Sequence, residues 1–238
     1  NLTTAQATGG SGTDTILNVE NLYGSAYGDT LRGNASGNQL YGAAGNDLIY
    51  VGTGTASDRV DGGSGVDGVS YAYAGSRVNV NLNLTTAQAT GGSGTDTILN
   101  IENLYGSAYG DTLSGNASGN QLYGAAGNDI LNGMGGNDTL NGGAGLDTFV
   151  FNTALSAMGN KDTITDFNVT DDTIQLENAI FTKLTTLGAL ATANFCANAT
   201  GIATDSNDFI CYNTTTGALS YDADGSGAGA SVAFAVLG

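Results

Sequence analysis

The sequence predicts an all-β fold, a parallel β-solenoid in which short strands stack in successive coils. A nine-residue unit repeats along the chain, with a glycine-rich hexamer first and a large apolar residue at its eighth position. One apolar residue in nine does not follow the 3.6-residue period of a helix. The chain holds 39 Gly and no Pro, and Gly at this density would cost a helix about 1 kcal/mol per residue. A six-residue turn followed by a three-residue strand satisfies both observations.

Repetition occurs at two levels. Residues 1–50 recur as residues 83–132 with only five differences, so the longer unit spans 82 residues. Inside it, consecutive nonapeptides from residue 106 read GSAYGDTLS, GNASGNQLY, GAAGNDILN, GMGGNDTLN and GGAGLDTFV. Self-similarity at a fixed period is typical of a solenoid, whose units bury their apolar faces only against their neighbours. The predicted core is the eighth position: Leu31, Leu40, Ile49, Val69, Ile98, Leu113, Leu122, Leu131, Leu140 and Phe149.

The repeats divide the chain into three expected parts. We predict a first module at 1–82, a second module at 83–150 and a β-rich cap at 151–238. Residue 1 aligns with Asn83, which lies inside the alternating run RVNVNLNL (77–84). A domain rarely begins in the middle of a strand, and we therefore expect this chain to be a fragment of a longer protein.

Charge and composition exclude several classes of function. The chain carries 22 acidic and 5 basic residues, a net charge of −17, which disfavours nucleic acid and anionic lipid and attracts divalent cations. Because there is no His, a Ser–His triad, a Cys–His pair and His-based zinc motifs are excluded. No apolar run approaches the ~18 residues of a membrane span. We find no catalytic constellation and expect this chain itself not to be an enzyme.

Two nonapeptides, GGAGLDTFV and GGSGTDTIL, match the pattern GGxGxDxUx in full, where U is large and apolar. Over roughly residues 9–150 the chain therefore resembles the RTX family of calcium-binding repeats. KDTITDFNVTDDTIQL (161–176) and residues 208–237 resemble the segments that follow such repeats in proteins exported by type I systems. The resemblance implies a right-handed parallel β-roll, several Ca²⁺ ions as cofactor, a type I (ABC) secretion apparatus as partner, and a secreted or bacterial cell-surface location.

The hexamers carry the residue types that calcium requires. Ca²⁺ takes 6–8 oxygen ligands at roughly 2.3–2.6 Å, and glycine at positive φ lets a turn direct several carbonyls at one point. Each hexamer offers about half a coordination shell, and the resemblance implies that units two apart share ions. The expected side-chain ligands are Asp29, Asn38, Asp47, Asp58, Asp67, Asp111, Asn120, Asp129, Asp138 and Asp147. The expected carbonyl ligands are Gly42, Ala44, Gly124, Ala126, Gly133, Gly135, Gly142 and Ala144.

Departures from the repeat weaken some of these sites. Asn38 and Asn120 replace Asp and remove charge, and the unit 52–61 is one residue too long. Spacings of 15 residues, from Asp14 to Asp29 and from Asp96 to Asp111, break the phase and make Asp14 and Asp96 doubtful ligands. The alternative interpretation of every hexamer is an ordinary Asp/Asn-Gly turn without metal.

The cap contains three further features. Asp162 and Asp166 are expected to bind calcium at the end of the repeats, and the acidic pair Asp171–Asp172 is expected to have a capping or peripheral calcium role. Both roles are favoured over paired catalytic carboxylates. DADGSG (222–227) resembles the start of an EF-hand loop, but Ala233 stands at its twelfth position, and a hairpin turn is the expected structure. Cys196 and Cys211 lie in probable strands and form either a disulfide or two small buried side chains.

The expected function is calcium-triggered folding outside the cell in support of type I secretion. Two parent proteins fit this function. The first is a structural or adhesin-type surface protein in which the 82-residue modules form a rod and contact neighbouring repeats or further copies. The alternative is a secreted protease, lipase or epimerase whose catalytic domain lies upstream. Near-identical tandem modules favour the first, since duplication lengthens a rod without new chemistry.

Overall fold

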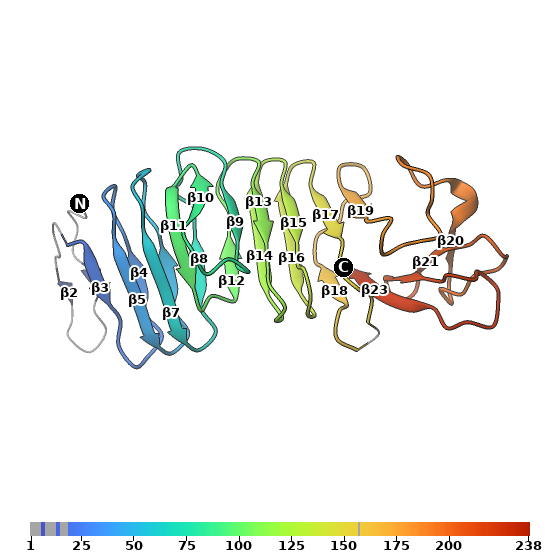
Figure 1. Ribbon diagram of the computed structural model, residues 1–238, viewed down its shortest axis with the longest axis horizontal. Coiled ribbons are helices and arrows are strands. Elements are labelled where there is room, and N and C mark those ends of the chain that lie inside the picture. The colour runs from blue at the N-terminus through green and yellow to red at the C-terminus, as the bar shows by residue number, and fades with distance from the viewer. Residues whose placement is uncertain (1–5, 8–12, 15–18, 157) are drawn as a thin grey trace. The chain divides into compact units, whose positions relative to one another are not determined.

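The computed structural model describes residues 6–7, 13–14, 19–156 and 158–238, and strands make up most of its regular structure (Figure 1). Contacts within the chain define two compact units, Asn1–Leu113 and Ser114–Gly238. The predicted boundary between residues 82 and 83 lies inside the first unit, and the division into 1–82, 83–150 and 151–238 stays a prediction. Strand β13 (Thr112–Ser114) contains the junction between the units.

In the first unit the chain alternates between two sheets, one strand to each per coil. The first sheet has the order β3-β5-β7-β11-β10 and the second contains β4-β6-β8-β12. Their bounds are β3 Asn21–Tyr23, β5 Gln39–Ala44, β7 Arg59–Ser64, β11 Gly94–Leu99, β10 Gln88–Gly91, β4 Thr30–Arg32, β6 Leu48–Tyr50, β8 Gly68–Ser70 and β12 Asn103–Tyr105. Adjacent strands are parallel, except that β10 is antiparallel to β11. The unit also contains β1 (Gln6–Ala7) antiparallel to β2 (Thr13–Asp14), and β9 (Asn79–Asn81).

Register between coils places predicted core residues, together with Val60 of the lengthened unit, in two continuous apolar rows. Leu40 pairs with Val60, and Val60 with Ile98, in one sheet. In the other sheet Ile49 pairs with Val69. The side chains of all five are buried. Leu40–Val60 and Ile49–Val69 join units two apart along the chain, which is the stacking that a solenoid of two strands per coil requires. The Val60–Ile98 pair continues the row across the segment that contains β8, β9 and β10.

The second unit continues the same architecture and then changes it. One sheet contains β14 (Gln121–Ala126), β16 (Thr139–Ala144), β18 (Asp162–Ile164), β23 (Val232–Leu237), β22 (Ala218–Tyr221), β21 (Ile210–Asn213) and β20 (Phe195–Asn198), in that order. The other contains β15 (Ile130–Asn132), β17 (Thr148–Phe151) and β19 (Thr173–Leu176). Pairing is parallel from β14 to β23, and β22 is antiparallel to both β23 and β21. Helical structure in the described part of this unit is one 3₁₀ turn, η2 (Thr192–Asn194).

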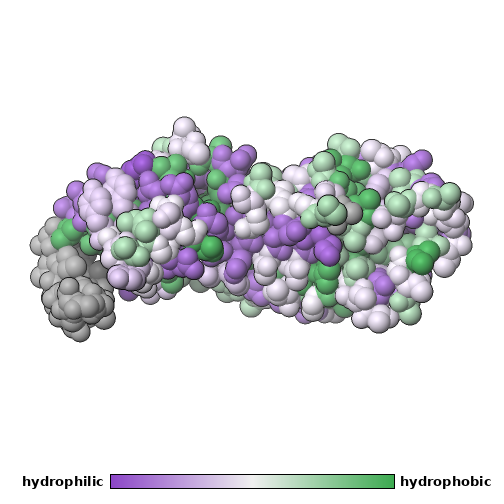
Figure 2. All heavy atoms as spheres, turned by 90° about the horizontal axis from the view of Figure 1, so that it is seen from below, coloured by the Kyte–Doolittle hydropathy of each residue, from purple (hydrophilic) through white to green (hydrophobic). Residues whose placement is uncertain are grey.

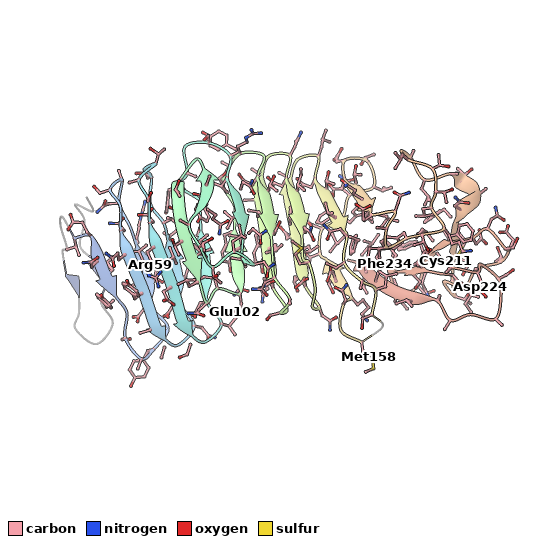
Figure 3. The ribbon with its side chains drawn as sticks, viewed as in Figure 1. Arg59, Glu102, Met158, Cys211, Asp224 and Phe234 are labelled. Carbon is pink, nitrogen blue, oxygen red and sulfur yellow. A yellow bond between two sulfur atoms is a disulfide. The ribbon has the colours of Figure 1, made fainter. Side chains whose placement is uncertain are left out.

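Aromatic side chains close the interior of the second unit at the end of the repeats. Phe234 on β23 lies among the last coils (Figure 3) and contacts the rings of Phe151 and Phe181 edge-on, with centroids 5.1 Å apart in each pair. Phe181 makes a similar contact with Tyr221 at 5.2 Å. Edge-to-face pairs of this kind stabilise a core beyond their buried area. The predicted β-rich cap therefore has its own aromatic core rather than a further row of nonapeptides.

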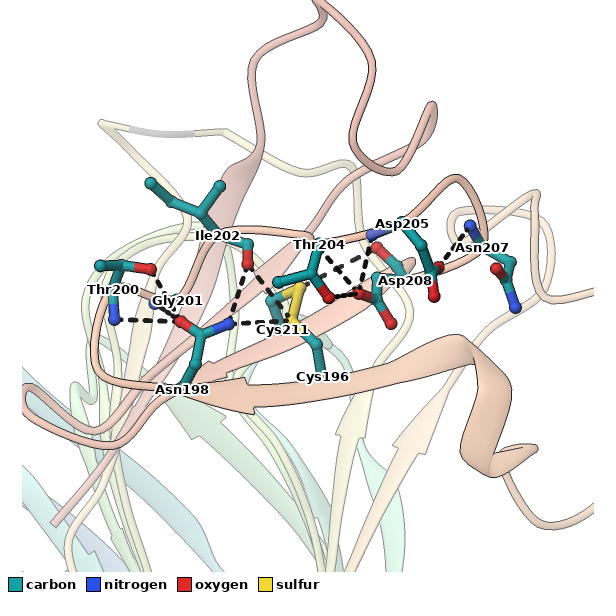
Figure 4. The surroundings of a disulfide bond; sticks show 10 residues. All are labelled: Cys196, Asn198, Thr200, Gly201, Ile202, Thr204, Asp205, Asn207, Asp208 and Cys211. Carbon is teal, nitrogen blue, oxygen red and sulfur yellow. Dashed lines mark hydrogen bonds between the residues drawn. A yellow bond between two sulfur atoms is a disulfide. The ribbon is translucent and has the colours of Figure 1, made fainter.

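A disulfide joins Cys196 on β20 to Cys211 on β21 (Figure 4), which resolves the two alternatives left by the sequence in favour of the bridge. The two residues are register partners in the parallel pair, with Cα atoms 4.6 Å apart. Around the bridge, Asn198 donates to the Ile202 carbonyl at 2.9 Å, and Thr204 donates its backbone N–H to Asp208 at 2.8 Å. DADGSG (222–227) lies in the connection between β22 and β23, as the hairpin interpretation predicts.

On the face drawn in Figure 2, hydrophobic side chains stand among polar ones. The most exposed large hydrophobic residue of the described part is Met158, on the loop after β17 (Figure 3). None of the described helical segments has the length and hydropathy that a membrane-spanning helix requires.

Candidate calcium-binding turns

Within each unit the glycine-rich turns stack through a repeated hydrogen bond. The backbone N–H of the residue at position six donates to the side-chain Oδ1 at position six of the turn two nonapeptides further along, or to Asp58 at position seven of the lengthened unit 52–61. The bonds run from Asp29 to Asp47 (2.7 Å), Asn38 to Asp58 (2.6 Å), Asp47 to Asp67 (2.8 Å), Asn120 to Asp138 (2.7 Å) and Asp129 to Asp147 (2.9 Å). The predicted stacking of nonapeptides two apart is therefore observed inside each compact unit. The predicted stack of Asp111 on Asp129 would join the two compact units and stays a prediction.

The same hydrogen bond continues to residues that the nine-residue phase does not identify. Asp58 donates its N–H to Asp96 at 2.9 Å, and the hydroxyl groups of Tyr71 and Thr90 also donate to Asp96. Asp67 donates its N–H to Glu102 (Figure 3) at 2.8 Å. Asp96 and Glu102 thus extend the two rows of stacked acidic side chains, one through Asp58 and one through Asp67. Their spacing in the sequence is irregular because the hairpin of β10 and β11 lies between β8 and β12. The side chain of Asp14, the other doubtful ligand, lies outside the described residues.

At the end of the repeats, carboxylates of the cap accept from the last turns. Asp162 accepts from the N–H of Asp138 at 3.1 Å, and Asp172 accepts from the N–H of Asp147 at 3.1 Å. The two oxygens of Asp166 accept from Gly142 and Gly143, at 3.1 and 2.7 Å. These carboxylates satisfy backbone donors of the final turns that no further coil covers. Asp172 belongs to the acidic pair Asp171–Asp172, for which the sequence predicts a capping or peripheral calcium role, and it lies against the last turn of its row.

Several of the stacked carboxylates have one oxygen that lacks a hydrogen-bond donor. The Oδ2 atoms of Asp47, Asp67, Asp138 and Asp147 are buried and have no hydrogen-bond partner among the described residues. Each of these four side chains is at most 3 % exposed. A buried carboxylate oxygen without a donor is costly in the folded state, unless a cation lies against it.

Glycine at position one makes room for these oxygens. An added Cβ on Gly42 would lie 2.2 Å from Asp47 Oδ2 and 2.4 Å from the Gly62 carbonyl of the next turn. On Gly142 it would lie 2.3 Å from Asp147 Oδ2, and on Gly133 2.2 Å from Asp138 Oδ2. The carboxylate and the carbonyl of the next turn are both acceptors, and they converge where no side chain can enter.

Burial dominates the electrostatics of these rows. It raises the pKa of Asp58 to about 7, against the lowering effect of the Asn38 N–H and with a further rise from the Asp96 carboxylate. Burial also raises the pKa of Asp138 to about 6 and that of Asp162 to about 8. The pKa values of Asp67, Asp96, Asp111 and Asp147 rise for the same reason. The folded chain without a cation therefore disfavours the charged form of these groups.

The donor set fits a hard cation bound by the backbone together with single carboxylates. In the described part of the chain no three Asp, Glu or Cys side chains gather into one metal-binding group. Each turn instead combines one carboxylate with carbonyls from glycine-rich backbone, which are the oxygen ligands that Ca²⁺ accepts. Position-six oxygens without a donor, as in Asp47 and Asp67, are the places where these residues fit such an ion.

Comparison with known proteins identifies two families. The family described as "Peptidase M10 serralysin C terminal" matches residues 64–210, and "RTX calcium-binding nonapeptide repeat (4 copies)" matches residues 23–56. Curated proteins give no match. Among solved structures, the extracellular lipase LipA from Serratia marcescens aligns at 16 % identity and a TM-score of 0.25, over 94 % of this chain and 38 % of that chain.

The family matches confirm the resemblance drawn from the nonapeptides, and the parallel two-strand coils confirm the β-roll. Both families are named for repeat or C-terminal regions rather than for a catalytic domain. The chain spans less than half of the length of the lipase to which it aligns. The serralysin C-terminal match covers more than half of the 238 residues, and the chain therefore belongs to that family and carries RTX calcium-binding nonapeptide repeats.

Proposed function

We propose that this chain is a calcium-dependent folding module of a bacterial protein exported by a type I system. The observation that carries the proposal is the set of buried Oδ2 atoms without donors at Asp47, Asp67, Asp138 and Asp147. In a calcium-poor cytosol these stacked carboxylates disfavour folding, and the glycine-rich chain is kept in an exportable state. Bound calcium supplies the positive charge that the row of carboxylates lacks.

Outside the cell, mass action shifts the equilibrium towards the folded state. An ion that binds only the folded chain stabilises it by RT ln(1 + [L]/Kd). Extracellular calcium modules have dissociation constants of about 10⁻⁴–10⁻³ M. At 10 mM calcium a site of about 10⁻⁴ M would contribute about 2.7 kcal/mol, and several sites contribute together. Folding on the outer side also opposes backward movement through the transporter.

Two parent proteins are compatible with this role, and a different observation favours each. The 82-residue duplication favours a structural or adhesin-type protein at the cell surface, in which the modules act as a rod. The serralysin C-terminal match favours a secreted enzyme whose catalytic domain precedes the repeats. The residues that precede the duplicated modules in the parent protein distinguish the two, because further 82-residue copies support the rod and a catalytic motif supports the enzyme.

The test is a titration of the calcium-depleted chain followed by circular dichroism and thermal melting. Addition of 10 mM CaCl₂ is expected to increase the β signal and the melting temperature, whereas MgCl₂ at the same concentration produces little change. Mg²⁺ demands stricter octahedral geometry at shorter distances and retains its waters, so turns built for Ca²⁺ do not suit it. Equal responses to the two salts would show an ionic-strength effect, and no response to calcium would refute the proposal.

A further inference from the structure

We propose that nine of the glycine-rich turns form two classes and that the complete calcium sites lie only where two turns of the open class stack. The lengthened turn 52–58 and the turn 91–96, inside the β10–β11 hairpin, belong to neither class. The open turns are 42–47, 62–67, 124–129, 133–138 and 142–147. The closed turns are 24–29, 33–38, 106–111 and 115–120. This inference rests on the proposed function and specifies which residues carry it.

In a closed turn, the side chain at position six is satisfied by its own turn. The N–H at position two donates to it, from Ser25 to Asp29 Oδ2 and from Ser107 to Asp111 Oδ2 at 2.5 Å. The corresponding bonds to Asn38 and Asn120 measure 2.7 and 2.8 Å. The serine hydroxyl groups also donate to Asp29 and Asp111. An oxygen that accepts these hydrogen bonds is not available to a cation. Asp and Asn at position six accept the same hydrogen bond in these turns.

In an open turn the backbone is reversed at two positions. Positions two and four have positive φ in all five, between 70° and 98° at position two and between 110° and 155° at position four. Position four is glycine in each: Gly45, Gly65, Gly127, Gly136 and Gly145. Closed turns carry Tyr or Ser there, and among the described residues with positive φ none belongs to a closed turn. In four of these turns the position-six Oδ2 has no hydrogen-bond donor among the described residues: Asp47, Asp67, Asp138 and Asp147.

Stacking then selects two pairs of turns. Strands β5 and β7 lie side by side (Figure 1), and their register continues into the turns, pairing Ala43 with Gly63 and Ala44 with Ser64. Strands β14 and β16 pair Ala125 with Gly143 in the same way. These four strands are six residues long, whereas β4, β6, β13 and β15 each have three. In both pairs, an open turn meets a second open turn in register.

The remaining open turn lacks such a neighbour. Turn 133–138 stacks on the closed turn 115–120, because Asn120 donates its N–H to Asp138. On its other side Asp138 donates to Asp162 in the cap. On the side of turn 115–120, the oxygen of Asn120 already accepts a hydrogen bond from its own turn and is not available to a cation. We therefore expect turn 133–138 to provide a weaker calcium site. The geometry assigns one complete site to each 82-residue module, at 42–47 with 62–67 and at 124–129 with 142–147.

The test measures calcium stoichiometry and affinity by isothermal titration calorimetry on the calcium-depleted full chain. Asp67→Asn and Asp147→Asn are each expected to remove one of two higher-affinity sites. Asp29→Asn is the matched control, since Asn38 and Asn120 show that a closed turn accommodates Asn, and it is expected to change the affinity less than twofold. Circular dichroism at 10 mM calcium verifies that each variant folds.

Asn120→Asp separates geometry from charge. The variant adds a carboxylate to a closed turn, and it is expected to leave the number of higher-affinity sites unchanged. A gained site in Asn120→Asp, or a loss in Asp29→Asn equal to that in Asp67→Asn, would overturn the two-class assignment while calcium binding by the wild-type chain still stands. If the wild-type chain binds no calcium, the proposed function itself fails.

Discussion

The pH dependence of the calcium-free fold tests whether buried carboxylates oppose folding. Asp58 is the clearest group, since it is 6 % exposed and lies between Asn38 and the carboxylate of Asp96. Burial raises the pKa of Asp58 from 3.8 to about 7 in the folded state. An acid whose folded pKa is raised binds more protons folded than unfolded, and its contribution to stability is lost as the pH rises from about 4 to 7.

The two pKa values of Asp58 give the magnitude of this effect. A shift from 3.8 to about 7 corresponds to about 4 kcal/mol, at about 1.4 kcal/mol per pKa unit. Asp58→Asn removes the charge and keeps an oxygen to accept the Asn38 N–H. We expect the variant to stabilise the calcium-free fold by about 4 kcal/mol at pH 8 and by less than half as much at pH 5, where the folded wild type is already protonated. Screening by water that reaches the site would reduce both values by roughly half and keep their order.

Urea unfolding followed by circular dichroism provides the measurement, in calcium-free buffers at pH 5 and pH 8. Wild type is expected to be less stable at pH 8, with a smaller difference between the two pH values in the variant. A reference variant, Asp61→Asn, removes a partly exposed charge that pairs with Arg59 and is expected to shift stability by less than 1 kcal/mol at both pH values. Equal effects of Asp58→Asn at both pH values would refute the reasoning, as would a wild type that gains stability at pH 8.

Two further predictions concern the bridge and the backbone. Replacement of Cys196 and Cys211 by Ala opens a loop of 15 residues and is expected to cost about 3 kcal/mol in urea unfolding, and a loss below 1 kcal/mol would contradict this. Ala125→Gly relieves a φ of 82° and is expected to leave stability unchanged or raise it by up to about 1 kcal/mol, whereas Ala126→Gly should lose about 0.5–1 kcal/mol. Equal losses in the two Gly variants would show that the turn is not strained.

The nine-residue phase predicts most of the repeat region because one residue per unit reports the interior. Leu131 and Phe149 are eighth-position residues of units two apart, and they are register partners that are fully buried. The phase fails before Asp96, where the four-residue strand β10 pairs antiparallel with β11 and the same row resumes at Asp96, 38 residues after Asp58. Sequence spacing alone does not show whether inserted residues form a separate hairpin and preserve the register of the later coils, or change that register.

The sequence predicted which position-six residues stack on one another, but it did not distinguish those of the open turns from those of the closed turns. Asp29 and Asp47 occupy the same position of the same repeat, yet only Asp29 accepts from the N–H at its own second position. The distinguishing residue is at position four, Tyr27 in one turn and Gly45 in the other. Position one requires glycine in both turns, because an added Cβ on Gly24 or Gly42 would collide with oxygens of the turns, whereas position four requires glycine only in the open turn, where φ is 110°.

Strain and unpaired charge occur in the same turns, and this indicates how the fold depends on an ion. Ala43, Ala125 and Met134 have positive φ without being glycine, a conformation that costs L-residues about 1–2 kcal/mol each. They lie in open turns, where Asp47 and Asp138 also bury an oxygen without a donor. Closed turns have neither feature, because their backbone and their side chains satisfy one another. Under the proposed two classes, a calcium-free chain has closed turns that are internally satisfied beside open turns that are not, and calcium is expected to act on the open turns. Folding in the absence of the ion is opposed at the open turns, while the closed turns keep the register in which those turns meet.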